Sequence, residues 1–279
     1  MTSAATELVA IERPARRRGA DRAGIGLGVG VATLYLSLIV FIPLGAVVLR
    51  AGENGPAGFF RAVTTPETAA ALTLTVGASL IVVAVDVVMG TLIAWVLVRD
   101  RFPGQRIVDT LIDMPFALPT IVAGLVLLTL YGPASPVGID LAYTQAGVVV
   151  ALLFVTLPFV VRTVQPVLLE LDREMEQAAA SLGAGPVTIF RRIVLPNLYP
   201  AIAAGAALSF ARSISEFGST VLISGNLPFR TQVAAVHIYG LIQSDDIAGA
   251  AAESTVLLVV ALLVLVGLDL VQRWAARRG

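Results

Sequence analysis

The residues best suited to chemistry in this sequence are Asp86, Arg212 and Glu216, which lie inside long apolar segments. A charge at the centre of a bilayer costs several kcal/mol unless it is paired or reached by water. We expect Asp86 and Arg212 near the middle of their segments, with Glu216 one helical turn beyond Arg212. Two interpretations follow: Arg212 and Glu216 form an i,i+4 pair that faces other helices, or Arg212, with Ser213 and Ser215, donates hydrogen bonds to a passing anion.

Side chains for covalent chemistry are scarce. The sequence contains no Cys, its 19 basic residues are all Arg, and His237 is the only histidine. Without Lys there is neither a nucleotide-binding P-loop nor a Schiff base, and without Cys there is no thiol nucleophile. One His cannot build the clusters that hold zinc. We therefore predict no catalytic residue, no metal site and no cofactor bound by this chain.

A serine hydrolase is the one catalytic alternative, because Ser224 and His237 could form a nucleophile and its base. The G-x-S-G context of intramembrane serine proteases fails at Leu222. Ser224 also falls at the outer end of its apolar segment. These two features argue against a hydrolase.

The elements that must position these residues are membrane-spanning helices. Of the 279 residues 57% are apolar, only 14% are charged, and the net charge is zero, so nothing indicates a nucleic-acid partner. A spanning helix needs about 20 apolar residues to cross the hydrocarbon layer of the bilayer. The apolar segments long enough to do so are six: 26–49, 70–98, 112–131, 145–168, 199–223 and 253–271. The sequence predicts an all-α polytopic membrane protein with six transmembrane helices.

The arginines predict the orientation, because short cytoplasmic loops retain positive charge. With the N-terminus inside, fifteen arginines fall on the cytoplasmic side, Arg212 lies within a span, and only Arg50, Arg61 and Arg230 face outward. We therefore expect a multi-pass protein of the cell membrane with both termini in the cytoplasm.

The same assignment divides the chain into three parts. We expect a basic cytoplasmic tail over residues 1–24, a transmembrane domain over 25–272 and a short cytoplasmic tail over 273–279. The transmembrane domain includes one long cytoplasmic loop, 169–198.

The loop 169–198 has the pattern of two short helices. Acidic residues from Asp172 onward fill a first turn, alanines follow, and glycines from Gly183 interrupt the pattern. Pro186 suits the first position of a second helix, which we expect to end at Leu195 and Pro196. From this pattern alone, an amphipathic segment lying on the membrane surface is an equally good interpretation.

The loop also resembles a known motif. Its spacing is similar to the E-A-A-x3-G-x9-I-x-L-P loop of binding-protein-dependent ABC importer permeases, carried here by Gln177, Ala178, Ala179, Gly183, Ile193, Leu195 and Pro196. The departure is Gln177, where that family usually has Glu, so an ion pair from this position is not expected. The resemblance implies that the loop couples the membrane helices to a separate ATPase subunit.

A narrower resemblance covers residues 33–272. The segments that carry it are A-W-V-L-V-R at 94–99, P-F-A-L-P-T at 115–120, L-P-F-V-V-R at 157–162, F-A-R-x3-E-F-G at 210–218 and I-S-G-N at 223–226. They resemble sulfate and thiosulfate permeases of the T type. Molybdate permeases share the R-x3-E-F-G stretch. The implied fold is that of a type I ABC importer permease, also called MetI-like.

The resemblance also implies partners and a pathway. The partners are two copies of an ATPase subunit that binds the ATP, a second permease subunit of W type, an extracytoplasmic sulfate-binding protein and the lipid bilayer of the inner membrane. The chain itself is then a transport subunit without covalent chemistry. The candidate translocation path consists of Asp86, Arg212, Ser213, Ser215 and Glu216.

Two alternatives for the transported species and the driving force stay open. The pathway could carry molybdate, tungstate or another oxyanion. More distantly, the chain could be a secondary transporter driven by protons or sodium through its intramembrane carboxylates. No inverted repeat is visible among the six spans, and a two-helix cytoplasmic loop has no purpose in such a transporter. An adjacent reading frame carrying a P-loop would favour the ABC permease.

Overall fold

The computed structural model describes residues 28–276, which form helices and no strands. The predicted basic tail over 1–24 lies outside the described residues. The chain divides into two units, one ending at Ala46 and one beginning at Val47. The first predicted span is confirmed as the helix Gly28–Ala51. It contains the π-helical segment η1 (Ser37–Phe41) and ends as α2 (Ile42–Ala51).

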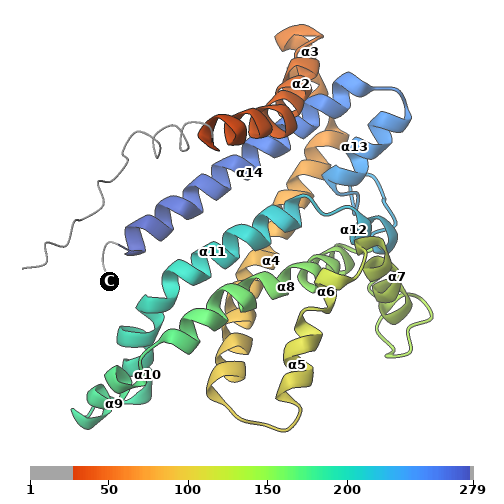
Figure 1. Ribbon diagram of the computed structural model, residues 1–279. Coiled ribbons are helices and arrows are strands. Elements are labelled where there is room, and N and C mark those ends of the chain that lie inside the picture. Colours follow the sequence, from red (N-terminus) through yellow and green to blue (C-terminus); the bar gives the residue numbers. More distant parts are fainter. Residues whose placement is uncertain (1–27, 277–279) are drawn as a thin grey trace, which may run out of the picture. The chain divides into compact units, whose positions relative to one another are not determined.

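The second unit contains the remaining helices, which are labelled in Figure 1 in chain order. They are α3 (Gly55–Val63), α4 (Pro66–Arg99), α5 (Gln105–Ile112), α6 (Met114–Ala117), α7 (Thr120–Tyr131), α8 (Gln145–Glu170), α9 (Arg173–Ser181), α10 (Pro186–Ile189), the π-helical segment η2 (Phe190–Val194), α11 (Leu195–Ile214), α12 (Gly218–Ile223), α13 (Ala234–Gln243) and α14 (Ile247–Ala276). Because α14 continues to Ala276, the predicted boundary of the C-terminal tail at 273 falls within a helix.

Five helices of the described residues are long and apolar enough to cross a membrane. They are Gly28–Ala51, Pro66–Arg99, Gln145–Glu170, Pro186–Ile214 and Ile247–Leu270. The remaining predicted span, 112–131, consists instead of α6 and α7. Pro119 interrupts the helix because the residue before a proline avoids helical backbone angles, and Leu118 is accordingly extended (φ −88°, ψ 135°). Within the described residues, all six predicted apolar segments are thus helical, and two of them, 112–131 and 199–223, are each divided between separate helices.

The helices α4, α8 and α11 pack against one another and form the centre of the second unit, with α14 beside α11 (Figure 1). Glycines allow the close approach. A Cβ atom on Gly90 of α4 would come within 2.8 Å of Val160 Cβ, and one on Gly205 of α11 within 2.9 Å of Val160 Cα. Small residues at such crossings are typical of membrane helices, where packing rather than the hydrophobic effect holds helices together.

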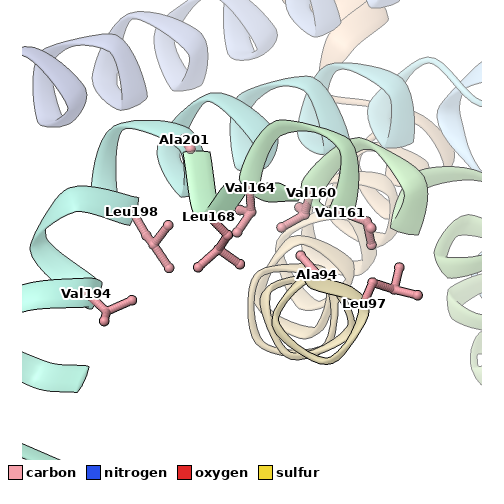
Figure 2. Packing of buried hydrophobic residues seen from close by; sticks show 9 residues of the cluster. All are labelled: Ala94, Leu97, Val160, Val161, Val164, Leu168, Val194, Leu198 and Ala201. Carbon is pink, nitrogen blue, oxygen red and sulfur yellow. The ribbon is translucent and has the colours of Figure 1, made fainter. Parts of the chain in front are cut away.

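Next to this crossing lies a core of small and branched side chains (Figure 2). It combines α4, α8, η2 and α11 through Ala94, Leu97, Val160, Val161, Val164, Leu168, Val194, Leu198 and Ala201. The core therefore includes the end of the cytoplasmic loop predicted from the sequence, and it joins that loop to the spanning helices.

The predicted end of the second loop helix at Leu195 and Pro196 is wrong. The helix that begins at Pro186 continues through both residues to Ile214. A proline inside an α-helix removes one hydrogen bond and its ring collides with the carbonyl four residues earlier. The turn before Pro196 is the wider π-helix η2, in which the Leu195 N–H bonds to the Phe190 carbonyl. The wider turn accommodates the proline without ending the helix.

Candidate functional site

The loop 169–198 contains the two helices predicted from its pattern. The side chain of Asp172 accepts a hydrogen bond of 2.8 Å from the Glu174 N–H and so caps α9. The turn after α9 needs a left-handed backbone, which Gly183 supplies with φ +87°. The second helix begins at Pro186, as expected.

The seven motif residues occupy three parts of this loop. Gln177, Ala178 and Ala179 lie on α9, Gly183 forms the turn, Ile193 belongs to η2, and Leu195 and Pro196 open α11. Leu182, at the end of α9, is 90% exposed, and Val187 just after the turn is 70% exposed. The tip of the loop therefore presents apolar side chains outside the helical bundle.

Asp86 is fully buried between α4, α8 and α11. Its Oδ2 atom lies 2.6 Å from the hydroxyl of Thr156 on α8 and 2.6 Å from the hydroxyl of Ser209 on α11. One helical turn further along α11, the Ser213 hydroxyl donates to that of Ser79 on α4 at 2.9 Å. This hydroxyl network connects three helices.

Sequence reasoning found Asp86 and Ser213 but missed Thr156, Ser209 and Ser79. The spacing of these polar residues along the sequence could have identified them. Ser209 and Ser213 are four residues apart, and Ser79 and Asp86 are seven apart, so each pair lies on one helical face.

Arg212 and Glu216 form the predicted pair, with 2.5 Å between Arg212 Nη2 and Glu216 Oε2. The predicted depth of Arg212 in mid-span is wrong, because α11 ends at Ile214. Glu216 lies in the break between α11 and α12 and is not part of a continued helix. Its Oε1 accepts hydrogen bonds from the N–H (2.8 Å) and hydroxyl (3.0 Å) of Ser219. Glu216 therefore both pairs with Arg212 and caps the start of α12.

The two partners of this pair differ in exposure. The Glu216 side chain is completely buried, while that of Arg212 is 31% exposed. Ser215 is exposed, and its hydroxyl donates to the Ala211 carbonyl at 2.9 Å. The candidate path residues thus separate into two groups: Asp86 and Ser213 are inside the bundle, and the others lie at the break between α11 and α12.

Gly218 fixes the position of this break against α7. A Cβ atom at Gly218 would come within 2.8 Å of the Ile121 backbone nitrogen, and one at Gly124 within 2.7 Å of the Ser219 carbonyl oxygen. Both glycines are needed for the close contact of α7 and α12. The E-F-G sequence at 216–218 thus provides both the residue that caps α12, Glu216, and the glycine that allows contact with α7, Gly218.

Ser224 and His237 are bonded to different partners. The Ser224 hydroxyl donates to Asn226 Oδ1 at 2.8 Å, while His237 Nδ1 lies 2.6 Å from Glu253 Oε2. Glu253 is 1% exposed. This arrangement gives Ser224 no base and offers no support for a hydrolase.

The predicted inner and outer loops lie at opposite ends of the central helices. At one end, Arg99 of α4 contacts Glu176 of the loop 169–198. At the other end, the Gln145 side chain at the start of α8 donates to the Arg230 carbonyl at 3.0 Å. The arrangement is compatible with the orientation deduced from the arginines, which itself stays a prediction.

These features define a class of protein. An all-helical bundle of apolar, membrane-length helices with buried charges and an exposed two-helix loop is typical of a multi-pass membrane protein. The chain belongs to the family described as "Binding-protein-dependent transport system inner membrane component", which matches residues 86–278. It is thus a transport subunit of the inner membrane with the ABC importer permease fold.

Curated relatives narrow the similarity further. The chain is 44% identical over 254 residues to the sulfate transport system permease protein CysT of Synechocystis, with 88% of this chain and 89% of the relative covered. It is 40% identical over 262 residues to the protein of the same name from Escherichia coli K12, with 91% and 95% covered. The resemblance to T-type sulfate permeases is confirmed.

Solved structures support the fold. A chain of a bacterial ABC transporter that imports the acidic polysaccharide alginate matches with a TM-score of 0.75 at 17% identity, covering 92% of this chain and 97% of that one. A chain of the MetNI methionine ABC transporter in an inward-facing conformation matches with a TM-score of 0.57 at 18% identity, covering 74% and 94%. At these identities the similarity concerns the fold alone, and it agrees with the predicted MetI-like architecture.

Proposed function

We propose that this chain forms part of the membrane pathway of an ATP-driven importer for sulfate and thiosulfate. The observation that carries the proposal is the 40–45% sequence identity to sulfate transport system permease proteins over most of the chain. The partners are two copies of an ATPase, a W-type second permease subunit and an extracytoplasmic sulfate-binding protein. ATP is bound and hydrolysed by the ATPase, and this chain has no cofactor of its own.

Uptake by the reconstituted complex tests the transported anion. Sulfate uptake into vesicles is measured with thiosulfate or molybdate as competitor. We expect sulfate and thiosulfate to compete and molybdate to do so weakly. If molybdate competes best, the chain is instead a permease for molybdate. The R-x3-E-F-G stretch is shared with molybdate permeases.

The loop between Asp172 and Pro196 is the proposed contact with the ATPase. The exposed apolar residues Leu182 and Val187 at its tip support this role. The positive φ of Gly183 gives a specific test, because a side chain there strains the turn. We expect Gly183→Asp to abolish uptake while the protein still inserts into the membrane.

A matched control separates backbone strain from added charge. Gly185 caps α10 with φ −73°, a conformation that Asp adopts readily at a helix N-cap. Gly185→Asp should therefore retain more uptake than Gly183→Asp. Uptake at the parental rate by a stably inserted Gly183→Asp variant would contradict the proposed contact.

The orientation is tested by labelling, because each introduced Cys is the only thiol of the chain. Membrane-impermeant reagents should label Cys at positions 53 and 245 in intact cells and leave Cys at positions 104 and 185 unlabelled. Labelling at position 185 would reverse the proposed topology.

At the break between α11 and α12, we assign Arg212 and Ser215 to transient contact with the passing anion. The partial exposure of Arg212 supports this assignment, because it leaves guanidinium donors available beyond those facing Glu216. A weak and transient contact suits conduction better than a tight site. Asp86 and Ser213 would keep α4, α8 and α11 in register beside this path.

A further inference from the structure

The cytoplasmic loop is attached to α4 by an ion pair between residues 77 positions apart. Arg99, the last residue of α4, lies 2.5 Å from Glu176 of α9 through its Nη2 atom. The two side chains are only 10% and 20% exposed. The pair Asp269 and Arg273 within α14, by contrast, is 48% and 70% exposed. Burial limits screening by water and salt, so the Arg99 pair holds its partners more firmly than an exposed one.

A second contact supports the same attachment. The Arg99 guanidinium lies over the Trp95 ring, 5.3 Å from its centroid. Trp95 in turn meets Phe190 of η2 edge to face, with 5.4 Å between centroids. One face of α4 thus contacts both halves of the loop, α9 through Arg99 and η2 through Trp95.

The contact with α4 matters because the loop is connected through the backbone to α8 and α11 but not to α4. The loop continues directly from α8 at its start and into α11 at its end, so a displacement of the loop reaches these helices along the backbone. The helix α4 has no such connection to the loop. Its contact with the loop consists of side chains, among which Arg99 and Glu176 provide the charged pair.

The position of Glu176 bears on the departure from the family motif, which usually has Glu where this chain has Gln177. Gln177 is exposed, whereas Glu176, about 100° away around the helix, faces Arg99. The loop therefore has its acidic anchor one residue before the position at which the family motif usually has Glu.

We propose that Arg99 and Glu176 are positioning residues that make α4 follow the loop when the ATPase moves it. The inference rests on the proposed coupling role of the loop. Through this pair, closure of the ATPase is transmitted to all three central helices and not only to α8 and α11. Loss of the pair would leave ATP hydrolysis running with less anion moved per ATP.

The test compares coupling efficiency in the reconstituted complex with its ATPase and binding protein. Sulfate uptake and ATP hydrolysis are measured together for Arg99→Gln, Glu176→Gln and the double variant. We expect each single variant to assemble and hydrolyse ATP but to move about tenfold less sulfate per ATP, within the usual range of coupling between sites. The double variant should be no worse than either single one, because both remove the same interaction.

The matched control is Asp269→Asn, which neutralises a carboxylate in an exposed pair within a single helix. It should keep the parental ratio of sulfate to ATP. A parental ratio in Glu176→Gln would overturn the inference, and so would additive losses in the double variant. The proposed function fails separately, if the unchanged complex shows no sulfate uptake or does not retain the ATPase.

Discussion

Two charged sites within the helical bundle are stabilised in different ways. Asp86 is fully buried and receives hydroxyl groups from α8 and α11. Arg212 and Glu216 pair at a break between two helices, where Arg212 keeps about a third of its side-chain surface exposed. A carboxylate surrounded by neutral donors connects helices, while a partly exposed guanidinium can still bind another anion. Depth in the membrane alone therefore does not identify a transport residue.

The largest expected effect comes from Glu216→Ala, which removes the partner of Arg212 and the cap of α12 together. The remaining Arg212 is 31% exposed, so leaving it unpaired costs less than the roughly 3 kcal/mol of a fully buried charge. Losing a helix cap costs about 1 kcal/mol more. We expect lower membrane abundance and a lower melting temperature of the purified complex. Glu216→Gln keeps an oxygen for Ser219 and should lose less. Equal melting temperatures for the parent and Glu216→Ala would show that the break is held by other contacts.

The next effect concerns the glycine that places this break against α7. Gly218→Val inserts a side chain against the Ile121 backbone, and such overpacking costs about 1–3 kcal/mol. The matched control is Gly267→Val in α14, where a Cβ atom meets nothing within 4 Å. Thermal unfolding of both variants measures the difference. A Gly218→Val protein as stable as the control would mean that α7 and α12 separate without cost.

The double change Arg212→Gln with Glu216→Gln tests whether Arg212 contributes to uptake as well as to stability. Removing both charges avoids the penalty of an unpaired one, so abundance should recover. Uptake should nevertheless be about tenfold slower, because a hydrogen bond to a charged group contributes about 1.5 kcal/mol. Uptake is compared with the parent at matched membrane abundance. A parental rate would leave Arg212 with a structural role only.

The smallest effect is expected for Asp86→Asn. The amide oxygen can accept the hydroxyls of Thr156 and Ser209, so the stability should change by about 1 kcal/mol or less. Uptake should stay close to the parental rate, which is measured together with abundance. Slow uptake by an abundant Asp86→Asn protein would instead place Asp86 on the anion path.

The features that sequence predicted well depend on short stretches of chain. Apolar segments of membrane length became helices because the bilayer requires the backbone to be hydrogen-bonded internally. The turn at Gly183 was predictable because glycine readily adopts a positive φ. The ion pair between Arg99 and Glu176 could not be predicted in this way, because it depends on where α4 ends relative to α9.

The errors arose where a local signal was offset by packing. Pro196 indicated a helix end, but a π-helical turn accommodated it. Arg212 was expected in mid-span because an apolar run continues to residue 223, yet the helix ends at Ile214 and a new one, capped by Glu216, begins at Gly218. The partners of Asp86 could not be chosen from periodicity, which gives the face of each helix but not the helix it meets.

The hydroxyl network around Asp86 also has a consequence for biosynthesis. Thr156 and Ser209 follow Asp86 by 70 and 123 residues. At a synthesis rate of about 5–20 residues per second, α4 is made roughly 6–25 seconds before the ribosome reaches Ser209. The carboxyl group lacks both hydroxyl donors until Thr156 is made and still lacks one of them until Ser209 is made. An aspartate at the centre of an inserting helix costs about 3 kcal/mol. Stable release of α4 into lipid is therefore expected to wait until α8 and α11 have emerged from the ribosome.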